Sequence, residues 1–307
     1  MSRFILFGVL SAQGGGAPAP LAGYFAGGDG ASRFDTIDRF AFPTDARTTL
    51  ATGLSSPTAA LGSFSDAAAA GYFAGGNRGF ITENVDKINY FTDARSNVSA
   101  GLSTGVRSGF GISNSTVAGY FGGGANSSFT LQTFIDKFVY PTDSRSTLGS
   151  TLSPAKEAGA GFSNSGVAGY FAGGQSPSST TNTQKLTFST EARSTLGTGL
   201  SAARGTCAAM SNSGVAGYVA GGFNVTSIDK FAYPSDTRSV IGATLSPQRS
   251  NVGGMANTGS AGYIGGGNSP TTADVNKLVF STESMSTLGT GLSVARQELA
   301  GCASEIV

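Results

Sequence analysis

The basic residues of this chain occupy repeated positions, and one of these positions could form an anion-binding site. Every Lys and Arg except Arg3, Arg33 and Arg78 falls in one of three positions that recur along the chain. The position that follows a Leu-Ser-x-x sequence, termed the LSxxR position, holds Lys156, Arg204, Arg249 and Arg296, and Arg107 lies one residue later than this position in its own unit. If the repeated units close into a ring with a central channel, such cations around the mouth of that channel would bind phosphate, sulfate or acidic sugars. Cations that repeat with a scaffold are most simply parts of it, and in the first unit Thr58 takes this position.

A second recurring position pairs an acid with an arginine two residues later. Asp45 with Arg47 and Asp143 with Arg145 are examples, each within a short polar segment. The acid can accept hydrogen bonds from turn amides, and the forked donors of Arg can reach carbonyl groups of the neighbouring unit. We predict a structural role for these pairs.

Catalysis has little support in the sequence. The chain has no His, the residue most often used for general acid–base chemistry and metal binding. The acids outside the repeated positions are scattered, with no evident pair: Asp29, Asp35, Asp66, Glu83, Glu157, Asp274, Glu298 and Glu305. A sialidase-like set of carboxylates and arginines is the remaining enzymatic alternative. We predict no enzyme activity, no cofactor and no metal site, and we expect Cys207 and Cys302 to be free thiols because a whole unit separates them.

Aromatic residues in variable loops are a further candidate site. The loops cover residues 29–36, 77–84, 125–133, 175–183, 223–227 and 268–274, and four of them contain Phe34, Phe80, Phe129 and Phe223 among Ser, Thr and Asn. Such loops on a rigid framework commonly carry recognition residues, here suited to carbohydrate or protein. The alternative is that they are solvated connections.

These residues are positioned by a repeat. The sequence Gly-Tyr followed by Phe, Val or Ile occurs six times, beginning at Gly23, Gly71, Gly119, Gly169, Gly217 and Gly262. A period of about 45 to 50 residues indicates one supersecondary unit that is stacked with its copies. Each unit divides into four short segments with strand character, two of them being residues 169–174 and 135–140, and none has a helical period.

Six units of four antiparallel strands predict an all-β, six-bladed β-propeller over residues 21–307. The fourth strand is expected at residues 146–149 and onward to Leu152, as an exposed edge. Residues 296–304 align with the innermost strands of the other units, and Cys302 falls where Phe162 and Met210 fall. We therefore expect the C-terminal strand to pair with the first unit and close the ring.

Residues 1–20 are not needed for this ring. They contain an apolar stretch, Phe4, Ile5, Leu6, Phe7, Val9 and Leu10, followed by a Gly/Ala/Pro-rich linker. We predict an attachment tag that docks on a partner or another copy; a short secretory signal and an extra strand on the first blade are the alternatives.

The repeat resembles the kelch repeat, through its double Gly after the second strand and through Leu-Ser-x-x-Arg, as in Leu200, Ser201 and Arg204. It departs from that family where kelch repeats carry Trp, since this chain has Leu148, Leu196 and Leu288. The combination of Ala-Gly-Tyr-Phe-Ala-Gly-Gly, Ile-Asp-Lys-Phe and Thr-Asp-x-Arg is similar to virion-associated kelch-like proteins of tailed phages, notably those infecting cyanobacteria.

That resemblance implies a non-enzymatic virion structural protein of the tail or its fibres, located on the particle and bound to other virion proteins or to further copies of itself. It would build the particle or contact the host surface, where a surface glycan is a further candidate partner. The alternatives are a secreted or surface lectin-like propeller and a cytoplasmic adaptor. A net charge of +1 gives no reason to expect nucleic-acid binding, and no apolar run is long enough to expect membrane insertion.

Overall fold

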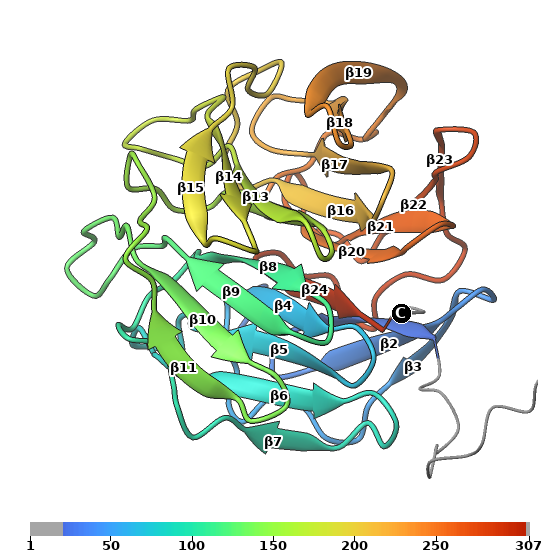
Figure 1. Cartoon of the computed structure of the whole chain (residues 1–307). Helices are drawn as coiled ribbons and strands as arrows, with labels where there is room; N and C mark the ends of the chain where they lie inside the picture. The colour runs from blue at the N-terminus through green and yellow to red at the C-terminus, as the bar shows by residue number, and fades with distance from the viewer. Residues whose placement is uncertain (1–20, 305–307) are drawn as a thin grey trace, which may run out of the picture.

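A computed structural model describes residues 21–304, which form a ring of six sheets around a common centre (Figure 1). Each sheet has four antiparallel strands, and residues 21–304 contain no helix. The sheets are the blades of a six-bladed β-propeller, so the predicted fold is confirmed.

In each blade four strands follow one another from the centre of the ring outward. Blade 1 contains β24 (Ala300–Ala303), β1 (Ala22–Ala26), β2 (Ile37–Ala41) and β3 (Ala46–Thr49); blade 2 contains β4 (Gly62–Asp66), β5 (Ala70–Ala74), β6 (Val85–Asn89) and β7 (Arg95–Asn97); blade 3 contains β8 (Phe110–Asn114), β9 (Ala118–Gly122), β10 (Ile135–Val139) and β11 (Ser144–Thr147). Blade 4 contains β12 (Ala160–Asn164), β13 (Ala168–Ala172), β14 (Thr183–Thr187) and β15 (Ala192–Thr195); blade 5 contains β16 (Ala208–Asn212), β17 (Ala216–Ala220), β18 (Ser227–Ala232) and β19 (Thr237–Thr244); blade 6 contains β20 (Gly253–Asn257), β21 (Ala261–Gly265), β22 (Val275–Val279) and β23 (Ser284–Thr287).

The two ends of the described chain close the ring. Strand β24 pairs antiparallel with β1, with Cys302 opposite Tyr24, the same register in which Phe162 faces Tyr170. The Ser304 amide donates to the Ala22 carbonyl at 2.9 Å. In Figure 1 the red β24 lies beside the blue strands of blade 1. The predicted closure is confirmed, and it leaves the inner strand of blade 1 paired like the others.

Exposure increases outward through each blade. The second strands are buried along their whole length, because they lie inside the sheet and are covered on both faces by neighbouring blades. The third strands alternate between buried and half-buried residues, whereas the fourth strands are mostly exposed. The fourth strand of blade 3 is Ser144–Thr147, two residues earlier than predicted, since the preceding turn closes at Asp143 in a left-handed conformation (φ 56°).

The glycine of each Gly-Tyr sequence is a socket for the preceding blade. A Cβ atom on any of these six glycines would overlap an inner-strand side chain of that blade, for example Phe162 for Gly217 and Met210 for Gly262. The double Gly is required for a different reason, because Gly123 and Gly124 both have positive φ and lie close to backbone carbonyls. A Cβ atom on Gly123 would lie 2.5 Å from the Lys156 carbonyl oxygen, and one on Gly124 would lie 2.6 Å from the Arg107 carbonyl oxygen.

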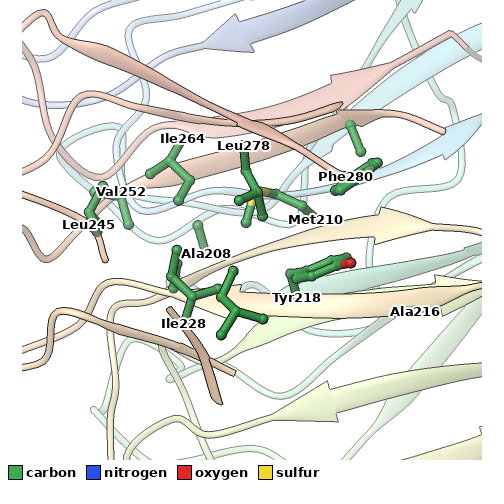
Figure 2. Close-up of a cluster of buried hydrophobic side chains, with 13 residues drawn as sticks. Ala208, Met210, Ala216, Tyr218, Ile228, Leu245, Val252, Ile264, Leu278 and Phe280 are labelled. Atoms are coloured by element: carbon green, nitrogen blue, oxygen red, sulfur yellow. The ribbon is translucent and has the colours of Figure 1, made fainter. Parts of the chain in front are cut away.

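Buried apolar clusters fill the spaces between adjacent blades. Figure 2 shows the cluster between blades 5 and 6, where Met210 and Tyr218 of blade 5 lie against Leu278 and Phe280 of blade 6. Tyr218 and Phe280 are stacked, with ring centroids 5.2 Å apart. Each blade thus buries its apolar face only against its neighbour, which explains why one unit cannot fold alone.

A polar clasp also joins each blade to the next, on the outer side of these clusters. The acid of each short turn between the third and fourth strands accepts from the Tyr hydroxyl of the preceding blade. In five clasps it also accepts from a Lys of that blade, whereas Asp93 forms an ion pair with Arg39 at 3.7 Å. In one clasp, Asp236 accepts from Tyr170 at 2.6 Å and from Lys185 at 2.7 Å. The six clasp acids are Asp45, Asp93, Asp143, Glu191, Asp236 and Glu283, all with φ between 51° and 58°.

The prediction for the acid and arginine pairs is therefore only partly right. The acid is structural, but it bonds across blades as well as shaping its turn. The expectation that the arginines reach carbonyls of the neighbouring unit holds for Arg238, which donates to the Gly199 carbonyl at 3.2 Å. Arg47 and Arg145 instead lie 3.5 Å from buried aspartates, Asp38 and Asp136, of their own blade. Each of these two arginines lies on the fourth strand, and its aspartate lies on the adjacent third strand of the same blade. A buried carboxylate needs such a cation nearby.

The strands have two ends, and the loops at these ends define two faces of the disc. The loop face carries the loops after the double Gly and the segments that connect one blade to the next. The turn face carries the tight turns, including the clasp acids. Residues 21 and 304 both lie on the turn face, because Leu21 accepts from the amide of Phe42 in a turn of that face and Ser304 pairs with Ala22.

We expect Gly217→Ala to destabilise the ring by about 1–3 kcal/mol or more, because the added methyl group overlaps the Phe162 ring in a packed core. The matched control is Gly149→Ala, at a glycine with nothing within 4 Å of the added Cβ. Urea unfolding of both variants measures the effect, and equal stabilities would contradict the socket.

For the clasp, we expect Asp236→Asn to lower the free energy of unfolding by about 1–2 kcal/mol, because the Tyr170 and Lys185 donors lose a charged acceptor. Asn tolerates the left-handed backbone of this residue (φ 57°), so the change isolates the charge. Glu83→Gln, at an exposed acid outside the clasps, should be neutral in the same measurement. An equal loss in both variants would argue against the clasp.

Candidate functional site

A closed ring of six backbone hydrogen bonds surrounds the channel mouth on the loop face. Each segment that enters a blade donates one amide to a carbonyl of the preceding blade's segment, at 2.6 to 2.9 Å. The residues are Ala60, Ser108, Ala158, Thr206, Asn251 and Glu298, each with φ between 53° and 56°. None of these residues is Gly, although a positive φ strains residues that have a side chain. Each of the six therefore carries a Cβ atom, and the hydrogen-bonded ring holds these six side-chain positions around the channel.

The LSxxR residues do not form the predicted ring of cations at this mouth. Lys156, Arg204, Arg249 and Arg296 are all 0% exposed. They bind carbonyls of the blade that they precede: Lys156 Nζ reaches Phe171 at 2.9 Å, Arg204 reaches Ser227 at 2.8 Å, Arg249 reaches Gly266 at 2.9 Å and Arg296 reaches Phe25 at 3.2 Å. Their donors satisfy carbonyls that the sheet leaves free, so the scaffold interpretation is correct for these four residues.

Blade 2 fills this buried position in another way. Thr58 stands in it, and the guanidinium of Arg78 approaches from the loop, with Nε 3.1 Å from Thr58 Oγ1 and Nη2 3.1 Å from Asp86. Arg78 is therefore a scaffold residue that sequence reasoning left outside the repeat. The sequence did contain a signal for this role. Blade 2 has Thr58 in place of the LSxxR cation but keeps Asp86, and this aspartate needs a cation from elsewhere in the chain.

In blade 3 the cation lies at the channel mouth and not in the buried position. Val106 fills the buried position, and Arg107 follows one residue later with a side chain that is 33% exposed. Its Cζ lies 5.0 Å from the centroid of the Phe129 ring, and its Nε lies 3.8 Å from Glu157 Oε2. Arg107 is thus the one predicted cation of the five that can meet a ligand.

A cavity of about 230 Å³ opens at this mouth. The polar side chains that line it include those of Arg107, Glu157, Gln175, Thr206, Asn251 and Glu298. Burial raises the pKa of Glu157 against the opposing effect of Arg107, and burial also raises the pKa of Glu298. Two acids that are scattered in the sequence are therefore brought to one cavity, which the linear spacing did not reveal.

Three of the predicted loop aromatics are well exposed on the loop face. The exposed fraction is 68% for Phe80, 72% for Phe129 and 58% for Phe223, whereas Phe34 is half-buried. These three rings are therefore accessible to a binding partner, as expected for recognition residues in loops. The predicted tag residues Phe4, Ile5, Leu6, Phe7, Val9 and Leu10 lie outside the described residues.

The remaining reactive groups are used by the fold. Cys207 and Cys302 are free and buried, and burial raises the pKa of the Cys207 thiol to about 11 and of the Cys302 thiol to about 12. In residues 21–304 no group of His, Cys, Asp and Glu could hold a metal ion. The described range also has no helix that is long and apolar enough to span a membrane.

Comparison with known proteins identifies a shared fold. The solved structure of YjhT is similar to this chain, with a TM-score of 0.70 and 15% sequence identity over 89% of this chain and 98% of YjhT. At this identity the likeness extends to the propeller fold alone. No protein-family model and no curated protein matches the chain.

Lys156 makes the stability of the ring depend on pH. Burial is the main cause that lowers its pKa to about 7, whereas in the unfolded chain it titrates near 10.5. Between these values the unfolded chain binds a proton that the folded chain lacks, so the free energy of unfolding should rise with pH, by at most about 1.4 kcal/mol per pH unit. We expect wild-type protein to gain stability from pH 7 to 9 in urea unfolding, relative to Lys156→Met. Parallel pH curves for the two proteins would contradict this assignment.

Proposed function

We propose that this chain is a non-enzymatic structural protein of a tailed-phage virion, in the tail or its fibres, that binds the particle through its turn face and presents its loop face outward. The proposal rests on the likeness of the repeat to kelch-like virion proteins, together with one observation about the disc. Both ends of the described chain lie on the turn face, and the exposed Phe80, Phe129 and Phe223 lie on the opposite face.

The turn face has features suited to attachment. Val117, Val167 and Val215, at equivalent turns of blades 3, 4 and 5, are 51%, 48% and 53% exposed. Leu21 and Ser304 lie on this same face, so an attachment tag in residues 1–20 would join the disc on the side that carries these valines. Partners on this side would be other virion proteins or further copies of the chain.

Rigidity also favours a structural role over catalysis. Apart from Arg107, the repeated charged residues bond within or between blades, and the ring is closed by strand pairing and six clasps. A framework of this kind can hold loops in place for contact with a partner.

The second candidate is a lectin-like glycan-binding propeller, secreted or on a cell surface. It is favoured by the polar, aromatic-containing loop face and by the cavity at the channel mouth. Under this candidate, glycan binding would be retained without any association with a particle.

Deletion of residues 1–20 should abolish incorporation into the particle, because the proposed attachment is removed while the ring of residues 21–304 stays intact. Purified particles from phage carrying the deletion would be assayed by immunoblot. The matched control is the triple variant Phe80→Ser, Phe129→Ser and Phe223→Ser, which should be incorporated normally and should reduce adsorption to the host. Normal incorporation of the deletion variant, or an absence of the protein from wild-type particles, would contradict the proposal.

A further inference from the structure

The blades also differ from one another at the channel mouth. The sockets, clasps and buried cations recur in nearly every blade because the scaffold requires them. At the two residues that follow the LSxxR position, the six blades instead carry Ala59 and Ala60, Arg107 and Ser108, Glu157 and Ala158, Gly205 and Thr206, Ser250 and Asn251, and Gln297 and Glu298. The backbone of this ring is the same in all six, so the scaffold does not explain the choice of side chain.

Among the described residues, the charged groups of this mouth form one long ion pair, Arg107 with Glu157 at 3.8 Å, and no hydrogen bonds. Within residues 21–304, no group donates a hydrogen bond to the carboxylates of Glu157 or Glu298, and the guanidinium of Arg107 donates none. Other buried acids accept several hydrogen bonds, although Oδ1 of Asp66 also has none: Asp38, for example, accepts from Thr49 and Ser293 and pairs with Arg296. Arg107 and Glu157 are joined only by their long ion pair, so their hydrogen-bonding groups are available to a ligand, and a ligand that supplies those bonds would be favoured.

The mixture of one guanidinium and two carboxylates around the cavity indicates which class of ligand would bind there. An anion would meet the carboxylates of Glu157 and Glu298, and a cation would meet the guanidinium of Arg107. A hydroxyl group can accept from Arg107 and donate to a carboxylate at the same time, and adjacent hydroxyls repeat this pattern. The exposed ring of Phe129 adds an apolar surface next to Arg107. The cavity, at about 230 Å³, is below the roughly 300–1,000 Å³ of sites for drug-sized ligands, and this favours a single sugar ring.

We infer that the loop-face mouth, with Arg107, Glu157 and Glu298 around its cavity, is a binding site for one uncharged sugar residue. The inference rests on the surface-contact part of the proposed function and gives that contact a location and a ligand class. The sugar would be the end of a surface glycan, since the cavity opens on the loop face.

Saturation-transfer NMR on the full chain tests this site with defined probes. The probes are the methyl glycosides of glucose, galactose, mannose and N-acetylglucosamine, with glucuronic acid and glucosamine as charged comparisons. We expect at least one neutral glycoside to bind, and to bind more tightly than either charged sugar. Binding of none of the neutral glycosides, or preferential binding of a charged sugar, would overturn the inference.

Three variants locate the binding. Arg107→Met and Glu157→Gln should each raise the dissociation constant of the bound glycoside about tenfold or more, since each removes a charged hydrogen-bonding group. Glu83→Gln, an exposed acid on the same face but outside the cavity, should bind like wild type. Glu157→Gln keeps the shape of the side chain, so it remains informative if Arg107→Met does not fold. Unchanged affinity in both cavity variants would refute the site.

Particle incorporation separates this inference from the function on which it rests. The cavity variants should be incorporated into particles like wild type, because the proposed attachment is on the opposite face. Loss of sugar binding with normal incorporation supports the site, whereas an absence of the wild-type protein from particles counts against the virion role and leaves the sugar result valid.

Discussion

The contact between one blade and the next is the constraint on which the ring depends. On the inner side, a glycine without a Cβ admits an apolar side chain of the preceding blade, as Gly217 admits Phe162. On the outer side, an acid held with a positive φ accepts from a tyrosine and a cation of that same blade, as Asp236 does from Tyr170 and Lys185. Because the last blade clasps the first through Asp45 and Tyr263, the chain of contacts has no free end.

This scaffold accounts for most of the charged residues, and so the departures from the repeat become informative. Four LSxxR cations are buried on backbone carbonyls, and in blade 2 Arg78 supplies the missing charge from another part of the chain. Blade 3 departs differently, because Val106 takes the buried position and leaves Arg107 at the mouth beside Glu157. A repeat protein can acquire a binding site in this way without altering the interfaces that hold it together.

Sequence reasoning found the fold because the repeat is written in residues with strict structural requirements. The Gly-Tyr sequences gave the blade count, and the alignment of Cys302 with inner-strand residues gave the closure. It did not find the direction of the side chains at the LSxxR position, since the same residue type serves a buried carbonyl or an exposed ligand equally well. The meeting of Glu157 and Glu298 was also hidden, because these residues belong to blades that are distant in sequence.

The sequence by itself determined the number of blades, the order of strands and the strand that closes the ring. These follow from local patterns: alternating burial, glycine where backbones or side chains approach closely, and one period repeated along the chain. Only the tertiary structure decided which charges are buried, which acids clasp which blade, and which side chains surround the channel mouth. Those properties depend on distances between residues of different blades, and these distances exist only once the ring has closed.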